Sequence, residues 1–243
     1  MKLFLVEDNQ AGAELGYEII EKSLKQGDVK VMGLATGSTP ITLYERIVAS
    51  DLDFSDIVSV NLDEYVGIGA DHDQSYNYFM NKHLFSKKPF KANYLPNGLN
   101  TNAEEECARY DAIIEANPID IQILGIGENG HIGFNEPGSS FDSKTSKVTL
   151  TESTILANAR MFEKVEDVPH YAYSMGIHSI MQSKKIILFA YGAKKAEAIR
   201  ATLEGPVDES MPASILQKHE DVIIICDKEA ASTLSAETIQ KFA

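Results

Sequence analysis

Short apolar runs alternate with helical patterns along the chain, and this order constrains the fold more than any other feature of the sequence. Several of the runs are apolar at successive positions, which is typical of parallel strands covered by helices on both faces. An α/β fold is therefore predicted, with an open, mostly parallel sheet. The predicted strands are 3–6, 29–35, 57–62, 119–126, 185–191 and 221–226.

Between these runs, apolar residues recur at the spacing of α-helices. The helix that ends before Asn117-Pro118 has the spacing of a capping box at Thr101 and Glu104. No linker, repeat or low-complexity tract divides the 243 residues, so we expect one domain over residues 1–243. The predicted helices are 9–26, 41–49, 75–84, 102–116, 193–203 and 213–219.

Charge and cysteine content restrict the partners and the compartment. The net charge of −14 makes nucleic acid and anionic membranes poor partners, so an anionic substrate needs local cations and backbone N–H groups. Cys107 and Cys226 lie on a predicted helix and a predicted strand, as packing residues do in a reducing compartment. The N-terminal apolar run is too short for a signal peptide, and no run suggests a membrane span. We expect a cytoplasmic protein.

Ligands bind beyond the carboxyl ends of the strands in such sheets, so the loops that follow strands are the first candidates. The stretch ATGSTP, residues 35–40, combines glycine and hydroxyl side chains before a helix. This pattern fits an anion cradle at a helix N-terminus, and it fits a plain tight turn with an N-cap equally well. No Walker-type lysine follows, which excludes a nucleoside-triphosphate loop.

Two adjacent acids, Asp63 and Glu64, follow the strand at 57–62 in the stretch NLDEYVG. Neighbouring residues of an extended chain point to opposite sides, so only one of the two can face a given pocket. One interpretation is a carboxylate base beside a structural acid. The alternative is a solvated acidic turn, which the pattern alone favours slightly.

The stretch GIGENGHIGFNEPGSS, residues 125–140, begins with the G-x-G-x-x-G pattern of dinucleotide-binding loops. The residues that follow break a helix: they include Gly130, Gly133 and Pro137. Glu152 has the spacing of a ribose-binding acid, but TEST at 151–154 predicts a helix start instead of a strand end. A dinucleotide site is therefore disfavoured.

The polar residues of this loop suit proton transfer. Histidine titrates near neutrality and can move protons in both directions, and Glu136 could orient His131. A metal site is a weak alternative because the loop has one histidine, one acid and no paired histidines; a plain polar turn is the other alternative. The candidates are Asn129, His131, Asn135 and Glu136.

Lys194 and Lys195 open the predicted helix after the strand at 185–191. The helix macrodipole disfavours cations at that end unless an anion lies nearby. A bound phosphate and two solvated lysines are equally consistent with the pattern. Arg160 in NARMF is a further candidate cation.

Six segments between residues 33 and 219 together resemble the glucosamine-6-phosphate deaminase (isomerase) family, with GHIGFNEP the most specific. The resemblance implies a modified Rossmann-like α/β sheet. It also implies an aldose–ketose isomerisation with deamination, which converts glucosamine 6-phosphate and water to fructose 6-phosphate and ammonia with no metal or redox cofactor. The segments are GLATGSTP, NLDEYVG, SYNYFM, GIGENGHIGFNEPGSS, NARMF and PASILQKH.

The resemblance also implies roles for individual residues. It makes His131 the group that opens the sugar ring, with Glu136 and the position of Asn129 completing the set. It makes Asp63 the base that moves a proton from C2 to C1. The implied phosphate ligands are Thr36, Gly37, Ser38, Thr39, Arg160 and Lys195.

Two departures from the family pattern carry expectations of their own. Many members have Asp where this chain has Asn129, and an amide can only orient or hydrogen-bond. Allosteric members bind an N-acetylated sugar phosphate through an arginine and a lysine where this chain has Ser146 and Val148. We therefore expect no such activation, and a monomer or low homo-oligomer instead of a hexamer.

Two other functions remain as alternatives. A 6-phosphogluconolactonase-like hydrolase shares a glycine-rich GH segment, but it is not expected to carry F-N-E-P or D-E-Y-V-G. A non-catalytic sugar-phosphate sensor needs no proton-transfer set, whereas Asp63, His131 and Glu136 are all present.

Overall fold

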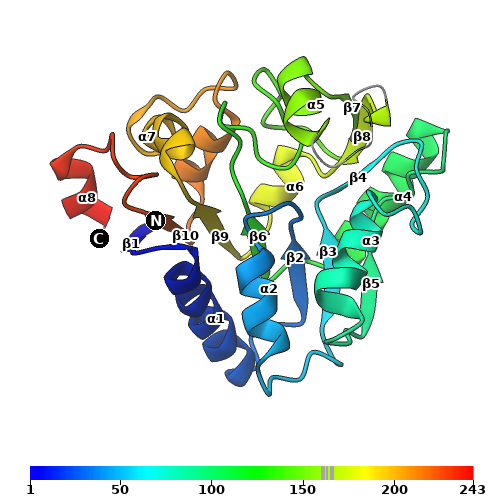
Figure 1. The fold of residues 1–243 in the computed structure, drawn as a ribbon, viewed down its shortest axis with the longest axis horizontal. Helices are drawn as coiled ribbons and strands as arrows, with labels where there is room; N and C mark the ends of the chain where they lie inside the picture. Colours follow the sequence, from blue (N-terminus) through cyan, green and yellow to red (C-terminus); the bar gives the residue numbers. More distant parts are fainter. Residues whose placement is uncertain (160–161, 163, 165–166, 243) are drawn as a thin grey trace.

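A parallel sheet of seven strands forms the centre of the computed structural model, which describes residues 1–159, 162, 164 and 167–242 (Figure 1). All of its neighbouring strands pair in parallel. The predicted α/β class, with an open parallel sheet, is therefore confirmed. In spatial order the strands are β1 (Lys2–Val6), β10 (Val222–Asp227), β9 (Lys185–Ala190), β6 (Ile121–Leu124), β2 (Val31–Leu34), β3 (Val58–Asn61) and β5 (Ala92–Tyr94).

Helices pack on both faces of this sheet. One face is covered by α1 (Asn9–Lys25), α2 (Ile41–Val48), α3 (Tyr76–Met80) and the π-helical turn η1 (Asn81–Phe85). The opposite face is covered by α4 (Ala103–Ala116), α6 (Ile177–Met181), α7 (Ala196–Glu204) and α8 (Ala236–Phe242), together with the 3₁₀ turns η3 (Ala193–Lys195) and η4 (Pro212–Lys218). The remaining helix, α5 (Glu152–Ala159), lies at the upper edge of Figure 1.

Two layers of core residues explain why the strands are apolar at successive positions. Along β9, Ile186 and Leu188 are buried against one face, while Ile187 and Phe189 are buried against the other. Side chains alternate between the faces of a strand, so both faces need apolar residues when helices cover both. No helix within the described residues is long and apolar enough to cross a membrane.

A second, antiparallel sheet was not predicted. It joins β4 (Asp63–Tyr65), β8 (Tyr171–Ser174) and β7 (Ser146–Thr149), in that order. Its strands have three or four residues and include polar ones, which is too short for periodicity to reveal. Only Leu62 separates β4 from β3, so the chain passes directly from the large sheet into the small one.

Local helix signals were accurate to within a few residues. The N-cap of α4 is Asn102, whose Oδ1 accepts the Glu105 backbone N–H, so the predicted cap at Thr101 and Glu104 is wrong by one position. The segment predicted as a helix at 213–219 is the 3₁₀ turn η4, which begins at Pro212. The Asp8 carboxylate caps α1 by accepting the Ala11 N–H at 2.8 Å.

The large sheet reverses its winding between β2 and β6. From β2 the chain adds β3 and β5 towards one edge, and from β6 it adds β9 and β10 towards the other. Ligands of open α/β sheets bind beyond the strand ends at such a reversal. The turn at 35–40 follows β2 and the loop at 125–140 follows β6, so the topology places both candidate segments there.

Candidate active site

The turn after β2 leads directly into α2. Pro40 is the N-cap residue and no side chain caps the helix, so the first backbone N–H groups of α2 have no side-chain acceptor. Residues 36, 37 and 39 of the turn are half-buried, and Ser38 is exposed. The Thr39 hydroxyl lies 3.8 Å from the point where a Cβ on Gly125 would stand. The turn therefore adjoins the start of the loop after β6.

Asp63 is the first residue of β4 and pairs with Ser174 of β8. Its side chain is buried, and no described residue donates a hydrogen bond to its carboxylate. A Cβ on Gly133 would stand 3.7 Å from Asp63 Oδ2, so the carboxylate borders the loop after β6. Burial, and to a smaller extent the charge of Glu64, raises the pKa of Asp63 to about 8. An unpaired buried carboxyl with a raised pKa is suited to act as a base.

Glu64 is also buried, but both oxygens of its carboxylate accept hydrogen bonds. It accepts the backbone N–H groups of Tyr65, Tyr76 and Asn77, each at 2.9 Å. Burial raises the pKa of Glu64 to about 7, although these three hydrogen bonds act in the opposite direction. The alternative of a solvated acidic turn is therefore wrong, because both acids are buried and one of them supports the backbone.

The loop after β6 makes no helix, as the sequence predicts. Its residues run through turns and one isolated bridge between Ile132 and Asn135. Gly127 lies against the imidazole of His131, and a Cβ at that position would collide with the ring. Gly127 of the G-x-G-x-x-G pattern therefore leaves the space that the His131 ring occupies.

Asn129, His131 and Glu136 form one cluster in this loop. The Asn129 Nδ2 donates to Glu136 Oε2 at 2.7 Å, and Asn129 Oδ1 accepts the His131 backbone N–H at 3.1 Å. His131 Nδ1 lies 3.4 Å from Glu136 Oε2, within ion-pair distance but without the alignment of a hydrogen bond.

Helix α5 contributes to the cluster, which the sequence did not reveal. Thr154 Oγ1 donates to Glu136 Oε1 at 2.7 Å, and Thr151 Oγ1 lies 3.4 Å from the same oxygen. Burial raises the pKa of Glu136, but the contacts with His131, Thr154 and Asn129 outweigh it and hold the pKa at about 2. TEST predicted the start of this helix correctly, but nothing in the pattern indicated that its hydroxyls face Glu136.

Both lysines after β9 contact the loop after β6, and Lys195 is the more buried of the two. Its Nζ donates to the Ile126 carbonyl oxygen at 2.7 Å, and burial lowers the pKa of Lys195. Lys194 is largely exposed and lies 3.6 Å from Glu128. Arg160, the other predicted cation, lies outside the described residues.

Ser174 and Asn135 hold the loop against the second sheet. Ser174 Oγ accepts the Phe134 backbone N–H at 3.0 Å. Asn135 Nδ2 donates to the carbonyl oxygens of Ile132 and Met175 at 2.8 and 2.9 Å. The Asn135 side-chain amide therefore hydrogen-bonds to the backbone. The sequence had made Asn135 a candidate functional residue of the loop. Ser174 gave no sequence signal, because its strand was not predicted.

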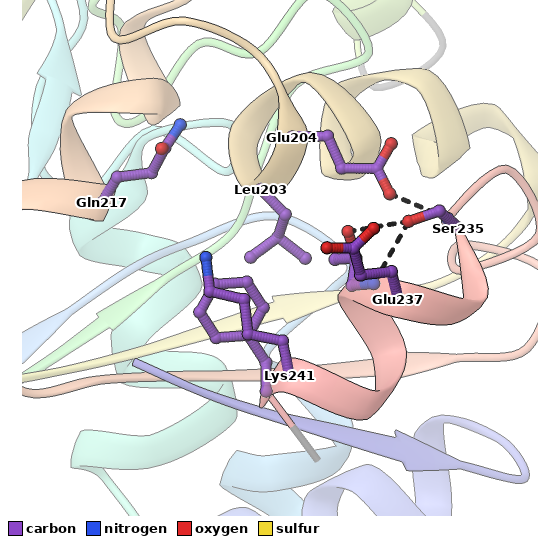
Figure 2. Close-up of a pocket in the computed structure, with 8 residues that line it drawn as sticks. Leu203, Glu204, Gln217, Ser235, Glu237 and Lys241 are labelled. Atoms are coloured by element: carbon purple, nitrogen blue, oxygen red, sulfur yellow. Dashed lines mark hydrogen bonds between the residues drawn. The ribbon is translucent and has the colours of Figure 1, made fainter.

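A hollow of about 430 Å³ lies elsewhere, between α7, η4 and α8 (Figure 2). Its polar groups pair with one another: Glu204 accepts the Ser235 N–H at 2.7 Å, and the Ser235 and Thr238 hydroxyls lie 3.0 Å apart. Its two acids, Glu204 and Glu237, outnumber its one lining cation, Lys241, which disfavours a phosphate. Among the described residues, no group of three or more His, Cys, Asp or Glu side chains could hold a metal ion.

Comparison with known proteins agrees with this geometry. Residues 8–225 match the model of the family described as glucosamine-6-phosphate isomerases/6-phosphogluconolactonase. A glucosamine-6-phosphate deaminase of Latilactobacillus sakei is 61% identical over 97% of this chain and 100% of its own length. The chain belongs to the glucosamine-6-phosphate deaminase family. The resemblance inferred from six short segments is thereby confirmed.

Solved structures of this family and its neighbours share the fold. A protein described as a monomeric glucosamine-6-phosphate deaminase superposes with a TM-score of 0.92 at 42% identity, over 96% of this chain and 100% of its own. A 6-phosphogluconolactonase from Leishmania guyanensis superposes with a TM-score of 0.80 at 19% identity, over 97% and 99% of the two chains. The second likeness concerns the fold alone.

Proposed function

We propose that this chain converts glucosamine 6-phosphate and water to fructose 6-phosphate and ammonia. The observation that carries the proposal is the approach of the buried Asp63, which accepts no hydrogen bond from a described residue, to the loop that holds His131 and Glu136. One group is suited to remove a carbon-bound proton and the other two to open a sugar ring. The deaminases named among the relatives support the same substrate.

Ring opening is assigned to His131. Neutral imidazole accepts the proton of the anomeric hydroxyl and returns one to the ring oxygen, so the ring C–O bond breaks without net charge. Glu136, ionised across the physiological range, stabilises the imidazolium between the two transfers. Asn129 holds the Glu136 carboxylate beside the ring by its 2.7 Å hydrogen bond.

Isomerisation is assigned to Asp63. Its carboxylate removes the C2 proton of the open-chain sugar while O1 takes up a proton from the substrate's own ammonium group, which gives an enolamine. The resulting carboxylic acid then returns its proton to C1. The product is an imine at C2. Water adds to that carbon and ammonia leaves, which gives the ketose. Asp63 has to be ionised at the first step, so kcat/KM falls as the pH drops through its pKa.

The substrate phosphate is assigned to the 36–39 turn together with Lys195 and Arg160. Uncapped N–H groups at the start of α2 and the hydroxyls of Thr36, Ser38 and Thr39 supply donors. Lys195 supplies positive charge from the opposite side of the strand reversal. Because Lys195 is half-buried, an anionic partner would stabilise its charged form. Together they would supply local positive charge in a chain whose overall charge is −14.

We further propose a cytoplasmic enzyme that acts as a monomer or low homo-oligomer without a metal or redox cofactor. Support comes from the two free thiols and from the related protein described as monomeric. Proton transfer by Asp63 and His131 requires no electron acceptor.

A coupled assay tests the proposed reaction. Purified protein is mixed with glucosamine 6-phosphate, and both fructose 6-phosphate and ammonia are measured. Equal molar release of the two is expected. Activity on 6-phosphogluconolactone with no ammonia from the amino sugar would contradict the proposal and favour the lactonase alternative.

A further inference from the structure

The two acids that open β4 have unlike surroundings. Glu64 accepts three backbone N–H groups, two of them from the first turn of α3, whereas no described residue donates to Asp63. A hollow of about 400 Å³ is lined by Glu64 and Asn77 but not by Asp63, so the two carboxylates point to different sides of the strand.

The hydrogen bonds make Glu64 the acid of the pair that ionises more readily. Three N–H groups and the positive end of a helix all favour the ionised form of a carboxylate. Asp63 has no such donors, so its proton is lost with more difficulty than that of Glu64. When Glu64 is ionised, its negative charge thus stands one residue from the proposed base.

The other titratable side chains that act on Asp63 are phenols. They are Tyr44 on α2, Tyr76 on α3 and Tyr110 on α4, all buried and uncharged at neutral pH. The Tyr44 and Tyr110 hydroxyls donate to the carbonyl oxygens of Ala35 and Asn61. Within the described residues, Glu64 is the charged group whose charge raises the pKa of Asp63.

We propose that Glu64 is a positioning residue for the proton transfer: it anchors β4 to α3 so that Asp63 faces the loop after β6, and it supplies the negative charge beside Asp63. Both effects act through Asp63, and Glu64 itself does not touch the sugar. This proposal rests on the proposed deaminase function.

The charge has a direct chemical consequence. A neighbouring carboxylate makes Asp63 hold its proton more tightly, which makes the ionised form a stronger base towards a carbon acid. The same charge moves the acidic limb of the activity profile to higher pH. Loss of the charge should therefore widen the active pH range and slow the proton transfer.

The test compares the pH profiles of kcat/KM for the wild type and Glu64→Gln. The amide loses the charge and the acceptor for the Asn77 N–H but keeps one oxygen for the other two donors. The acidic limb is expected to move down by about one pH unit. At the optimum, kcat is expected to fall roughly tenfold while KM changes little.

Glu106→Gln is the matched control. Glu106 is a buried carboxylate that also accepts a backbone N–H, from Asn97 at 2.7 Å, and pairs with Arg109. Its replacement should lower the melting temperature without moving the acidic limb. If Glu64→Gln behaves in the same way, Glu64 has only a structural role and the proposal is overturned.

Glu64→Asp separates charge from position and serves if Glu64→Gln does not fold. The shorter side chain keeps the charge but cannot reach all three N–H groups in the same geometry. An unchanged acidic limb with a lower kcat is expected; an unchanged kcat with a raised KM would overturn the proposal. An inactive wild type would instead contradict the deaminase function itself.

Discussion

Asn129 is the residue at which we expect this chain to differ from many members of its family, and its contacts are those of an amide. Its Nδ2 donates to Glu136 Oε2 at 2.7 Å while its Oδ1 accepts the His131 N–H. A carboxylate at the same position could still accept from His131, but it has no N–H group to donate to Glu136. The amide therefore allows Glu136 to remain ionised at low pH.

Asn129→Asp should raise the pKa of Glu136, because a second carboxylate would stand at hydrogen-bonding distance. A pair of acids in such contact shares a proton. In the wild type, Glu136 has a pKa of about 2 and does not titrate in the assay range. In the variant, we expect kcat/KM to fall more steeply as the pH is lowered. Stopped or coupled assays between pH 5 and 8 would measure this.

Asn129→Ala provides the comparison for that experiment. Alanine removes the hydrogen bond without adding a charge, so it should lower kcat while changing the profile less than aspartate does. Superimposable profiles for the wild type and Asn129→Asp would show that position 129 does not control the ionisation of Glu136.

At the scale of elements, α5 supplies a hydrogen-bond donor to Glu136 from outside the loop after β6. Thr154→Val preserves shape and removes the donor to Glu136 Oε1. A hydrogen bond to a charged group contributes about 1.5–3 kcal/mol, so we expect kcat/KM to fall roughly tenfold or more. The coupled assay and a thermal melt measure the two possible effects separately.

Thr202→Val is the matched control on α7. Thr202 is fully buried, and its hydroxyl donates to the Ala198 carbonyl oxygen at 2.7 Å, away from the site. Its replacement should leave kcat/KM near the wild-type value. Equal losses in both variants would mean that α5 affects the site only through general stability.

The elements that could be predicted from the sequence are those with a continuous apolar pattern. KIILFA of β9 has one core layer on each face and is clear from composition alone. SKVT and YAYS, which form β7 and β8, are short and place polar or exposed residues among apolar ones. Their pairing depends on contacts between distant segments, which a single sequence does not display.

The residues of the site could likewise be predicted only where they do not depend on contacts between distant segments. His131 and Glu136 could be proposed because they share one loop, and Asp63 because it follows a strand. The hydroxyls of Thr154 and Ser174 could not, because α5 and β8 reach the loop only in the folded chain. The sequence also left open whether Asp63 and Glu64 were solvated, and the structure shows that both are buried.

At the scale of the whole molecule, the reversal of winding between β2 and β6 brings the candidate groups together. The turn after β2, the loop after β6 and the start of β4 all lie beyond strand ends on one side of the sheet. Lys195 reaches the same place from the segment after β9. Charges that are far apart in the sequence can thus act on one small anionic sugar.

Regulation is a property of the whole molecule as well. Ser146 and Val148 lie on β7, where the allosteric members are expected to carry cations, and neither can bind a phosphate by charge. We expect N-acetylglucosamine 6-phosphate to leave the substrate saturation curve unchanged and hyperbolic. Size-exclusion chromatography with light scattering should give a mass near 26.7 kDa or a small multiple of it. Marked activation, or a hexamer, would contradict this expectation.

The central claim is that Asp63 is the base of a deamination, and Asp63→Asn tests it most directly. The variant keeps size and hydrogen-bonding capacity but removes the carboxylate. We predict that ammonia release from glucosamine 6-phosphate falls by a factor of about 10³ or more, since general-base catalysis contributes about 10²–10⁴. Binding of glucosamine 6-phosphate, measured by calorimetry on the same preparation, should remain close to wild type. Near-normal ammonia release by the folded variant would contradict the account.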